Sequence, residues 1–254
     1  MTDIRFDFSD KTAIVTGAAS GIGQAVAQEL AASGACVIVS DLTAAACRAV
    51  VDQITEAGGR ARAFAADVSD ETAMRALVDF AEADCGGLHL AVNNAGIGGP
   101  SLPTGAYPVE DWRRVIDINL NGVFYGMRWQ IPAMLRAGGG AIVNMSSILG
   151  SVGFAHAAPY VAAKHALLGL TRTAAIEYAP QRVRVNAVGP AFINTPLLSD
   201  NLSPEVLAGL AALHPMGRIG TPQEVSALTC FLLSERASFI TGSYHLVDGG
   251  YTAP

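Results

Sequence analysis

The fold of this chain follows from its early stretch Thr12-Ala13-Ile14-Val15-Thr16-Gly17-Ala18-Ala19-Ser20-Gly21-Ile22-Gly23. The first five of these residues are mostly apolar or β-branched and predict a buried strand. Glycines follow at once, and the pattern over residues 22–33 is that of a helix. A strand that ends in a glycine-rich turn and leads into a helix is typical of the first unit of an α/β sheet.

The same alternation of short apolar runs and longer helical patterns continues to the end of the chain. Further strands are predicted at 36–40, 88–92, 141–145 and 183–188, with weaker candidates at 61–66 and 244–247. The helical patterns lie near residues 22–33, 43–57, 70–84, 108–136, 157–179 and 222–234. Right-handed crossovers between such strands predict a parallel sheet of about seven strands with helices on both faces.

We expect residues 1–254 to form a single domain, because no repeat or linker interrupts this pattern. One segment differs, from about 190 to 220, where Pro190, Pro196, Pro204 and Pro215 surround a short helical pattern at 203–213. A long excursion of this kind in a compact domain is usually functional. We interpret the segment as a lid over a substrate site.

Composition limits the class of function. The chain is 51% hydrophobic and 15% charged, with a formal net charge of −6, which disfavours nucleic acid, anionic membranes and acidic partners. No apolar run approaches the ~18 residues of a membrane span, and the N-terminal sequence lacks the order of a secretory signal, so a cytoplasmic location is expected. The four cysteines are scattered, so neither a metal site nor a disulfide is predicted.

The glycine-rich turn predicts a dinucleotide site. Glycines allow the backbone to approach a pyrophosphate closely, and the start of the helix offers free N–H groups and a positive dipole end. The spacing Gly-x-x-x-Gly-x-Gly differs from the Gly-x-Gly-x-x-Gly fingerprint, so the position directly after the first strand carries the interpretation. The predicted contacts are Gly17, Ser20, Gly21, Ile22 and Gly23.

Asp41 indicates which dinucleotide is bound. It ends the second strand, where a carboxylate accepts hydrogen bonds from the adenosine ribose and repels a 2′-phosphate. No basic residue lies in the turn or directly after Asp41, so NAD is favoured over NADP. Asp41 could also cap the helix that follows. Asp67 and Val68, after the third strand, are predicted to contact the adenine, although Asp67 could instead cap the next helix.

Tyr160 and Lys164 stand four residues apart, and Ser147 lies thirteen residues before the tyrosine. On a helix, residues at i and i+4 share one face, so the Lys164 ammonium would favour the Tyr160 phenolate. A tyrosine titrates near pH ~10, about three units above what general acid–base catalysis at neutrality needs. One partly solvated lysine would not supply this shift, and an oxidised nicotinamide ring would add a second positive charge.

These motifs, taken together, resemble those of the short-chain dehydrogenase/reductase family over essentially the whole chain. The matching elements are Thr16-Gly17-x-x-x-Gly21-x-Gly23, Asn93-Asn94-Ala95-Gly96, Asn119, Ser147, Tyr160-x-x-x-Lys164 and Val247-Asp248-Gly249-Gly250. The resemblance implies a Rossmann-type doubly wound sheet and reversible hydride transfer between a nicotinamide and an alcohol or carbonyl. Ala191 departs from the family, which usually has glycine there, and disfavours a positive φ.

The resemblance also implies a role for each matching residue. Tyr160 would exchange a proton with the substrate oxygen, Ser147, rather than its neighbour Ser146, would hydrogen-bond that oxygen, and Lys164 would hold the nicotinamide ribose. Asn119 would anchor a water linking Lys164 to solvent, although it could equally mark only a helix bend. The other cofactor contacts implied are Asn94, Ala95, Gly96, Tyr160, Lys164, Pro190, Ile193 and Thr195.

The expected substrate pocket is apolar, with no arginine or lysine that would pair a carboxylate or phosphate of the substrate. A small neutral secondary alcohol or ketone suits such a pocket. The residues predicted to contact it are Ser147, Leu149, Phe154, Tyr160, Phe192 and Leu198.

Two alternative functions remain open at this point, as does the oligomeric state. One alternative is a 3-oxoacyl-[acyl-carrier-protein] reductase that uses NADPH, and the other is a catalytically idle dinucleotide-binding protein. Relatives in the family are commonly tetramers that pack the helices near 108–136 and 157–179 across one interface. A homotetramer is therefore expected.

Overall fold

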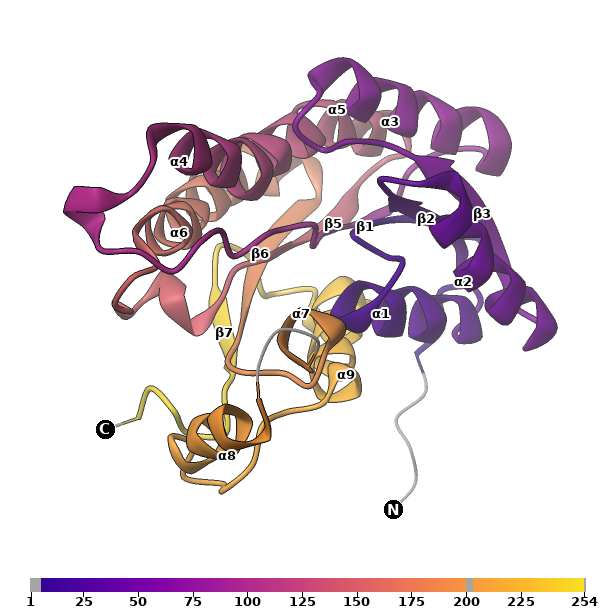
Figure 1. Cartoon of the computed structure of the whole chain (residues 1–254). Helices are drawn as coiled ribbons and strands as arrows, with labels where there is room; N and C mark the ends of the chain where they lie inside the picture. The colour runs from indigo at the N-terminus through magenta and orange to yellow at the C-terminus, as the bar shows by residue number, and fades with distance from the viewer. Residues whose placement is uncertain (1–5, 200–202, 254) are drawn as a thin grey trace.

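A single seven-stranded parallel sheet forms the centre of the protein (Figure 1). The computed structural model describes residues 6–199 and 203–253. The strand order is β3-β2-β1-β4-β5-β6-β7. The strands are β1 (Thr12–Thr16), β2 (Cys36–Asp41), β3 (Arg60–Ala65), β4 (Leu90–Asn93), β5 (Gly140–Met145), β6 (Val183–Pro190) and β7 (Tyr244–Val247). Every predicted strand is confirmed, with ends that differ by at most two residues.

Helices cover both faces of this sheet, as predicted. One face carries α1 (Gly21–Ala32), α2 (Ala44–Glu56) and α9 (Pro222–Leu233), and the other carries α3 (Glu71–Cys85), α5 (Gly122–Arg136) and α6 (Ala158–Tyr178). Short elements fill the connections: η1 (Thr104–Ala106), α4 (Val109–Ile116), η3 (Ile148–Gly150), η4 (Ala179–Gln181), α7 (Pro196–Ser199), α8 (Pro204–Ala212) and η5 (Glu235–Ala237).

Two hydrophobic clusters, one on each face, hold these layers together. Successive side chains of a strand point to opposite faces, so Val15 of β1 joins the cluster of α1 and α9, whereas Ile14 joins that of α3, α5 and α6. Both side chains are fully buried. Burial on both faces explains why the central strands are mostly apolar and do not alternate regularly with polar residues.

The strand order reverses between β1 and β4, and this reversal positions the site. The connection from β1 leads to β2 on one side, and β4 continues the sheet on the other side. The turns after the two strands therefore diverge and leave a crevice at their carboxyl ends, where open α/β sheets bind ligands.

The helix predicted at 108–136 is not continuous, which corrects the prediction. A π-helical turn, η2 (Asp117–Asn121), separates α4 from α5. Asn119 in this turn is completely buried, and its side-chain amide donates to the Ile97 carbonyl and accepts from the Ile97 N–H, both at 2.8 Å. The wider turn carries the amide inward to this backbone, a use typical of π-turns at functional sites.

The predicted lid segment contains α7 and α8, and its residues 200–202 lie outside the described residues. The helix predicted at 203–213 is confirmed as α8, which begins at a Ser203 cap whose hydroxyl accepts from Val206 N.

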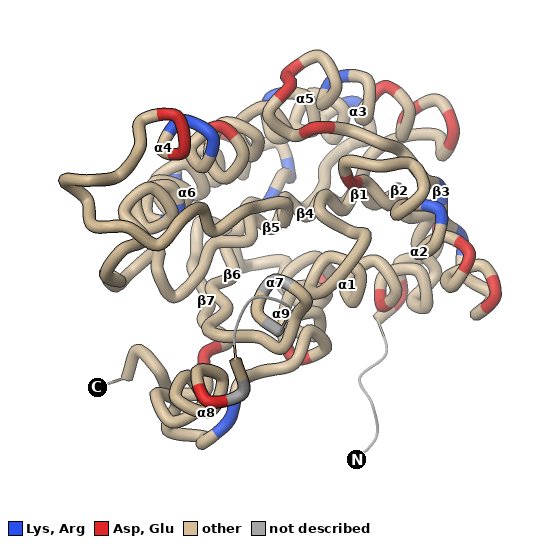
Figure 2. Tube along the Cα trace, viewed as in Figure 1, with Lys and Arg blue, Asp and Glu red and all other residues tan. Residues whose placement is uncertain are grey.

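Charged residues of both signs are spread over the outer helices, as the traces of α3 and α4 in Figure 2 show. Cys36, Cys47, Cys85 and Cys230 are free thiols. Within residues 6–199 and 203–253, no helix combines the length and the apolar character that crossing a membrane requires.

Candidate active site

The glycine-rich turn is shaped by positions that only glycine suits. Gly17 and Gly21 have φ of 63° and 55°, in the left-handed region that side chains disfavour. A Cβ on Gly23 would overlap the Gly17 carbonyl and stand 2.6 Å from Nδ2 of Asn94. The start of α1 therefore packs directly against the turn. Gly23 allows this close contact and does not itself line the crevice.

Asn94 ties the turn to the neighbouring strand. Its Nδ2 donates to the carbonyls of Thr16, at 3.0 Å, and Gly17, at 3.1 Å. The Thr16 hydroxyl in turn accepts from the N–H groups of Asn94 and Ala95. These bonds join the ends of β1 and β4 and fix the floor of the crevice.

Helix α1 begins without a side-chain cap, in contrast to neighbouring helices in the described structure. Ser20 occupies its cap position and accepts no hydrogen bond there, whereas Thr43 caps α2 and Asp70 caps α3. No acidic side chain lies in the first turn of α1. Its N–H groups and positive dipole end thus stay available to an anion in the crevice.

Asp41 holds the glycine turn in place. Its carboxylate accepts from Ala19 N at 3.0 Å and from Leu42 N at 2.8 Å. The alternative in which Asp41 caps α2 is wrong, because Thr43 takes that position. Asp67 likewise does not cap α3, and it accepts instead from the N–H and hydroxyl of Ser69.

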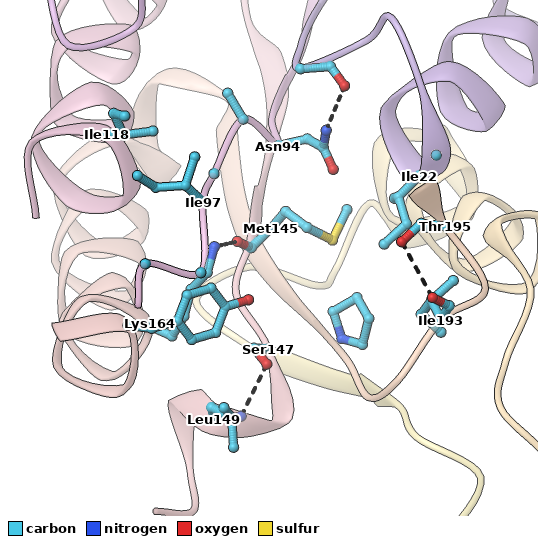
Figure 3. A pocket seen from close by; sticks show the side chains of 18 of the residues that line it. Ile22, Asn94, Ile97, Ile118, Met145, Ser147, Leu149, Lys164, Ile193 and Thr195 are labelled. Carbon is cyan, nitrogen blue, oxygen red and sulfur yellow. Dashed lines mark hydrogen bonds between the residues drawn. The ribbon is translucent and has the colours of Figure 1, made fainter. Parts of the chain in front are cut away.

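A cleft of about 630 Å³ runs from these residues to the Tyr160 helix. Figure 3 shows Lys164 and Ser147 on one side of it and Ile22 and Thr195 on the other. Gly23 and Asn119, behind the walls, are absent from its described lining. Every other predicted cofactor or substrate contact lines it, namely Gly17, Ser20, Gly21, Ile22, Asp41, Asp67, Val68, Asn94, Ala95, Gly96, Ser147, Leu149, Phe154, Tyr160, Lys164, Pro190, Phe192, Ile193, Thr195 and Leu198.

The two adjacent serines have different partners. Ser146 Oγ donates to the carbonyl of Lys164 at 3.0 Å, so its proton is used inside the fold. Ser147 Oγ accepts from Leu149 N at 3.2 Å, which leaves its own hydrogen to be donated elsewhere. This arrangement agrees with the choice of Ser147 as the residue that orients the substrate.

Lys164 lies one turn of α6 from Tyr160 and is only 3% exposed. Its Nζ lies 5.4 Å from the Tyr160 ring centroid and donates to the Met145 carbonyl at 2.7 Å. Burial lowers the pKa of Lys164 to about 8. The expectation of a partly solvated lysine is therefore wrong.

The pKa of Tyr160 shifts opposite to the expectation in the protein alone. Burial raises this pKa above its ordinary value, and the nearby Ser147 hydroxyl only partly offsets the increase. The predicted lowering by Lys164 is not seen, because desolvation of the phenolate by burial is the largest effect on the Tyr160 pKa. A low phenol pKa therefore needs a further positive charge in the cleft.

Burial of Lys164 has a consequence for stability in the cofactor-free protein. Its pKa is about 8 when folded and 10.5 ordinarily, so the unfolded chain binds more protons between these values. The Lys164 contribution to the free energy of unfolding then rises with pH, by ~3 kcal/mol across the window. We expect urea unfolding from about pH 7 to pH 10 to show the native protein gaining stability relative to Lys164→Met. A pH-independent difference would contradict this shift.

Ala191 fits without strain. Its φ is not positive, and its N–H donates to the Val247 carbonyl at 3.1 Å. The glycine usual in the resembled family is thus not required by the backbone at this position, and the Ala191 methyl group adds to the lining of the cleft.

Aromatic rings form the wall at the substrate end. The ring centroids of Phe154 and Phe192 are 6.1 Å apart, edge to face. Behind Phe192 lie His214 and Tyr251, at 5.8 Å and 5.9 Å. These two residues were not predicted as part of the wall, because the segment after α8 and the segment after β7 meet only in the folded protein. The side chains that face the cleft from this wall, Phe154 and Phe192, are apolar.

Known proteins resemble the chain over nearly its whole length. A family model described as enoyl-(acyl carrier protein) reductase matches residues 17–252. The crystal structure of a short-chain type dehydrogenase/reductase from Mycobacterium marinum superposes with a TM-score of 0.94, at 36% identity and 98% coverage of each chain. This chain belongs to the short-chain dehydrogenase/reductase family.

Two curated relatives of this short-chain dehydrogenase/reductase carry specific names. The cyclohexanol dehydrogenase of Acinetobacter sp. (strain SE19) is 49% identical over 246 residues, covering 97% of this chain and 96% of that protein. The cis-4-hydroxycyclohexanecarboxylate dehydrogenase of Sinomonas cyclohexanicum is 46% identical over 246 residues, covering 97% and 98%. The predicted family, fold and enzyme class, an oxidoreductase acting on CH–OH groups, are thereby confirmed.

Enzymes of this family use nicotinamide dinucleotides, and the crevice of this short-chain dehydrogenase/reductase fits such a group. The uncapped start of α1 suits a pyrophosphate, and the positive φ values of Gly17 and Gly21 let backbone approach it. A Cβ on Gly96 would stand 3.1 Å from Oδ1 of Asn119 and 3.7 Å from Nζ of Lys164, so glycine keeps the centre of the cleft open.

Proposed function

We propose that this short-chain dehydrogenase/reductase is an NAD-dependent dehydrogenase of neutral alicyclic secondary alcohols, with Tyr160 as the general acid and base. The observation that carries the proposal is that Ser147, Tyr160 and Lys164 line one cleft with the glycine turn and Asp41. A dinucleotide binder without catalysis would have no use for a half-buried phenol beside a buried amine and a serine hydroxyl. The reverse reaction is reduction of the matching ketone.

In the proposed mechanism Ser147 and Tyr160 hold the substrate oxygen between them. Ser147 donates its hydroxyl hydrogen, which the Leu149 N–H bond leaves free. During oxidation Tyr160 takes the alcohol proton, and during reduction it returns one. A bound nicotinamide ring supplies the chemistry of hydride transfer, and in its oxidised form the positive charge that favours the phenolate.

Lys164 and Asn119 would carry the proton away from Tyr160. Lys164 is buried beside the phenol, and its lowered pKa of about 8 allows it to give and take a proton near neutrality. We propose that the π-turn at Asn119 holds a water between Lys164 and solvent. The side-chain amide of Asn119 is already bonded to Ile97, so the backbone of Asn119 would bind this water.

The chemistry of the cleft supports both NAD and an uncharged ring substrate. Asp41 places a carboxylate at the adenosine end, and Leu42, directly after it, is 67% exposed and uncharged. At the other end Leu149, Phe154, Phe192 and Leu198 make an apolar wall, and Lys164 is the only lysine or arginine in the described lining. The two curated relatives whose names refer to cyclohexane rings add support for an alicyclic substrate.

An activity screen tests the proposal. The purified enzyme is mixed with NAD and either cyclohexanol, a methylcyclohexanol or the straight-chain 2-hexanol, and the absorbance of NADH is followed. We expect kcat/KM to be at least about tenfold higher for the rings, because a preformed apolar wall orders a rigid ring at less entropic cost. Turnover only with NADPH and a 3-oxoacyl thioester would instead establish the acyl-reductase alternative.

We also propose a homotetramer. Phe124 of α5 and Ile176 of α6 are 48% and 79% exposed, and Phe239, before β7, is fully exposed. Large apolar side chains on two separate faces suit two interfaces with other copies of the chain. Light scattering of the purified protein tests the mass. That segment 190–220 acts as a lid stays a prediction. The cytoplasmic location also stays a prediction.

A further inference from the structure

A second tyrosine contacts the backbone of Ser147 from the edge of the sheet. Tyr244 is the first residue of β7, and its hydroxyl donates a hydrogen bond of 2.5 Å to the Ser147 carbonyl. The same carbonyl accepts from Gly150 N at 2.8 Å. Two donors, one local and one 97 residues away in the chain, thus fix the peptide that follows Ser147.

Gly189 makes this long reach possible. β6 lies between β7 and β5 in the sheet, and Ser147 follows the end of β5 (Figure 1). A Cβ on Gly189 of β6 would overlap the Tyr244 ring. The ring therefore lies across β6 at the one position without a side chain, and it carries the hydroxyl from the outer strand to the catalytic serine.

Tyr244 is also close to other groups at this site. The Tyr244 phenol raises the pKa of Tyr160, and the nearby Ser151 hydroxyl, directly after η3, works against the rise in the pKa of Tyr244 itself. Burial raises the pKa of Tyr244 above its ordinary value, so its hydroxyl stays a protonated donor at neutral pH. Tyr244 can therefore hold the Ser147 carbonyl throughout the catalytic cycle.

We propose that Tyr244 is a positioning residue for the interconversion of alcohol and ketone, acting through the Ser147 backbone. The inference rests on the proposed roles of Ser147 and Tyr160. The Ser147 carbonyl begins the turn η3, and the Leu149 N–H that holds Ser147 Oγ belongs to the same turn. Fixing the carbonyl from β7 fixes the turn, and with it the direction in which Ser147 offers its hydrogen to the substrate oxygen.

Tyr244→Phe tests this role, because it keeps the ring over Gly189 and removes only the donor. We expect kcat with the ring alcohol to fall about tenfold, since small displacements of an orienting group are costly in the transition state. The dissociation constant of NADH, measured by fluorescence, should stay within about twofold, which also shows that the variant is folded. Gly189→Ala, which displaces the ring but keeps the hydroxyl, should reduce kcat similarly. Tyr178→Phe, at the far end of α6, is the matched control.

A double-mutant cycle separates positioning from a general structural role. In a Ser147→Ala background, assayed at high enzyme concentration, Tyr244→Phe should lower kcat by less than about twofold, because the group it positions is gone. An equal loss in both backgrounds, or no loss in the native background, overturns the inference. Failure of the proposed function would look different, because Ser147→Ala and Tyr160→Phe would themselves then keep native turnover.

Discussion

Tyr160→Phe is expected to lower kcat/KM for a ring alcohol by about 10³-fold, the largest catalytic effect of any single change. General acid–base catalysis by a positioned group contributes roughly 10² to 10⁴ in rate, and no other described phenol lines the cleft. The phenylalanine ring keeps the packing beside Lys164, so NADH affinity should change by less than about threefold. Steady-state kinetics and fluorescence titration measure the two quantities.

The pH dependence adds a second readout to this comparison. Because burial raises the pKa of Tyr160, alcohol oxidation by the native enzyme should increase with pH as the phenolate forms in the ternary complex. The residual activity of Tyr160→Phe should lack this increase. Tyr178→Phe removes a phenol from the opposite end of the same helix and should behave as native. Native-like turnover by Tyr160→Phe would mean that another group exchanges the proton.

The sheet and the glycine turn could be predicted because their signals are local. The strand Thr12–Thr16 is buried on both faces, and such strands are apolar almost throughout, here with a threonine at each end. Gly17 and Gly21 stand where the backbone takes positive φ, which few other residues tolerate. Even the weak strand candidates at the two edges of the sheet were correct, because the alternation with helices allowed little else.

The features that sequence did not predict depend on contacts between distant segments. The π-turn at Asn119 exists because its amide meets Ile97, 22 residues earlier, and a helical pattern carries no sign of that contact. The link from Tyr244 to Ser147 needs Gly189 on the strand between them. A glycine within a strand, where it weakens packing, was the one available signal of a close approach.

The direction of the Tyr160 pKa was mispredicted for a related reason. The spacing of Tyr160 and Lys164 correctly placed both on one face of α6, with Nζ 5.4 Å from the ring centroid. The spacing did not indicate how deeply that face of the helix is buried. Desolvation acts on both groups, and it raises the pKa of the phenol while lowering that of the amine. Burial, a property of the whole fold, outweighed the pairwise attraction.

Asp41→Asn is expected to shift the ratio of NADPH to NADH dissociation constants by about 10²-fold towards NADPH, from a native preference for NADH. In the proposed binding mode the native carboxylate would face a 2′-phosphate, and like charges a few ångströms apart at a protein surface repel by several kcal/mol. Leu42→Arg, added at an exposed neighbouring side chain, should raise NADPH affinity further by pairing the phosphate. Fluorescence titration with each reduced cofactor measures the affinities.

Asp41 has two proposed roles, to repel a 2′-phosphate and to hold the glycine turn. The direction in which each cofactor affinity changes separates these roles. The carboxylate also accepts from Ala19 N and Leu42 N, and an asparagine replaces one accepting oxygen with a donor. A loosened glycine turn would weaken both cofactors together, whereas removal of the repulsion strengthens NADPH alone. Glu56→Gln, an exposed charge at the end of α2, controls for net charge and should change neither affinity. Equal native affinities for NADH and NADPH would show that Asp41 acts only on the turn and that cofactor choice lies elsewhere.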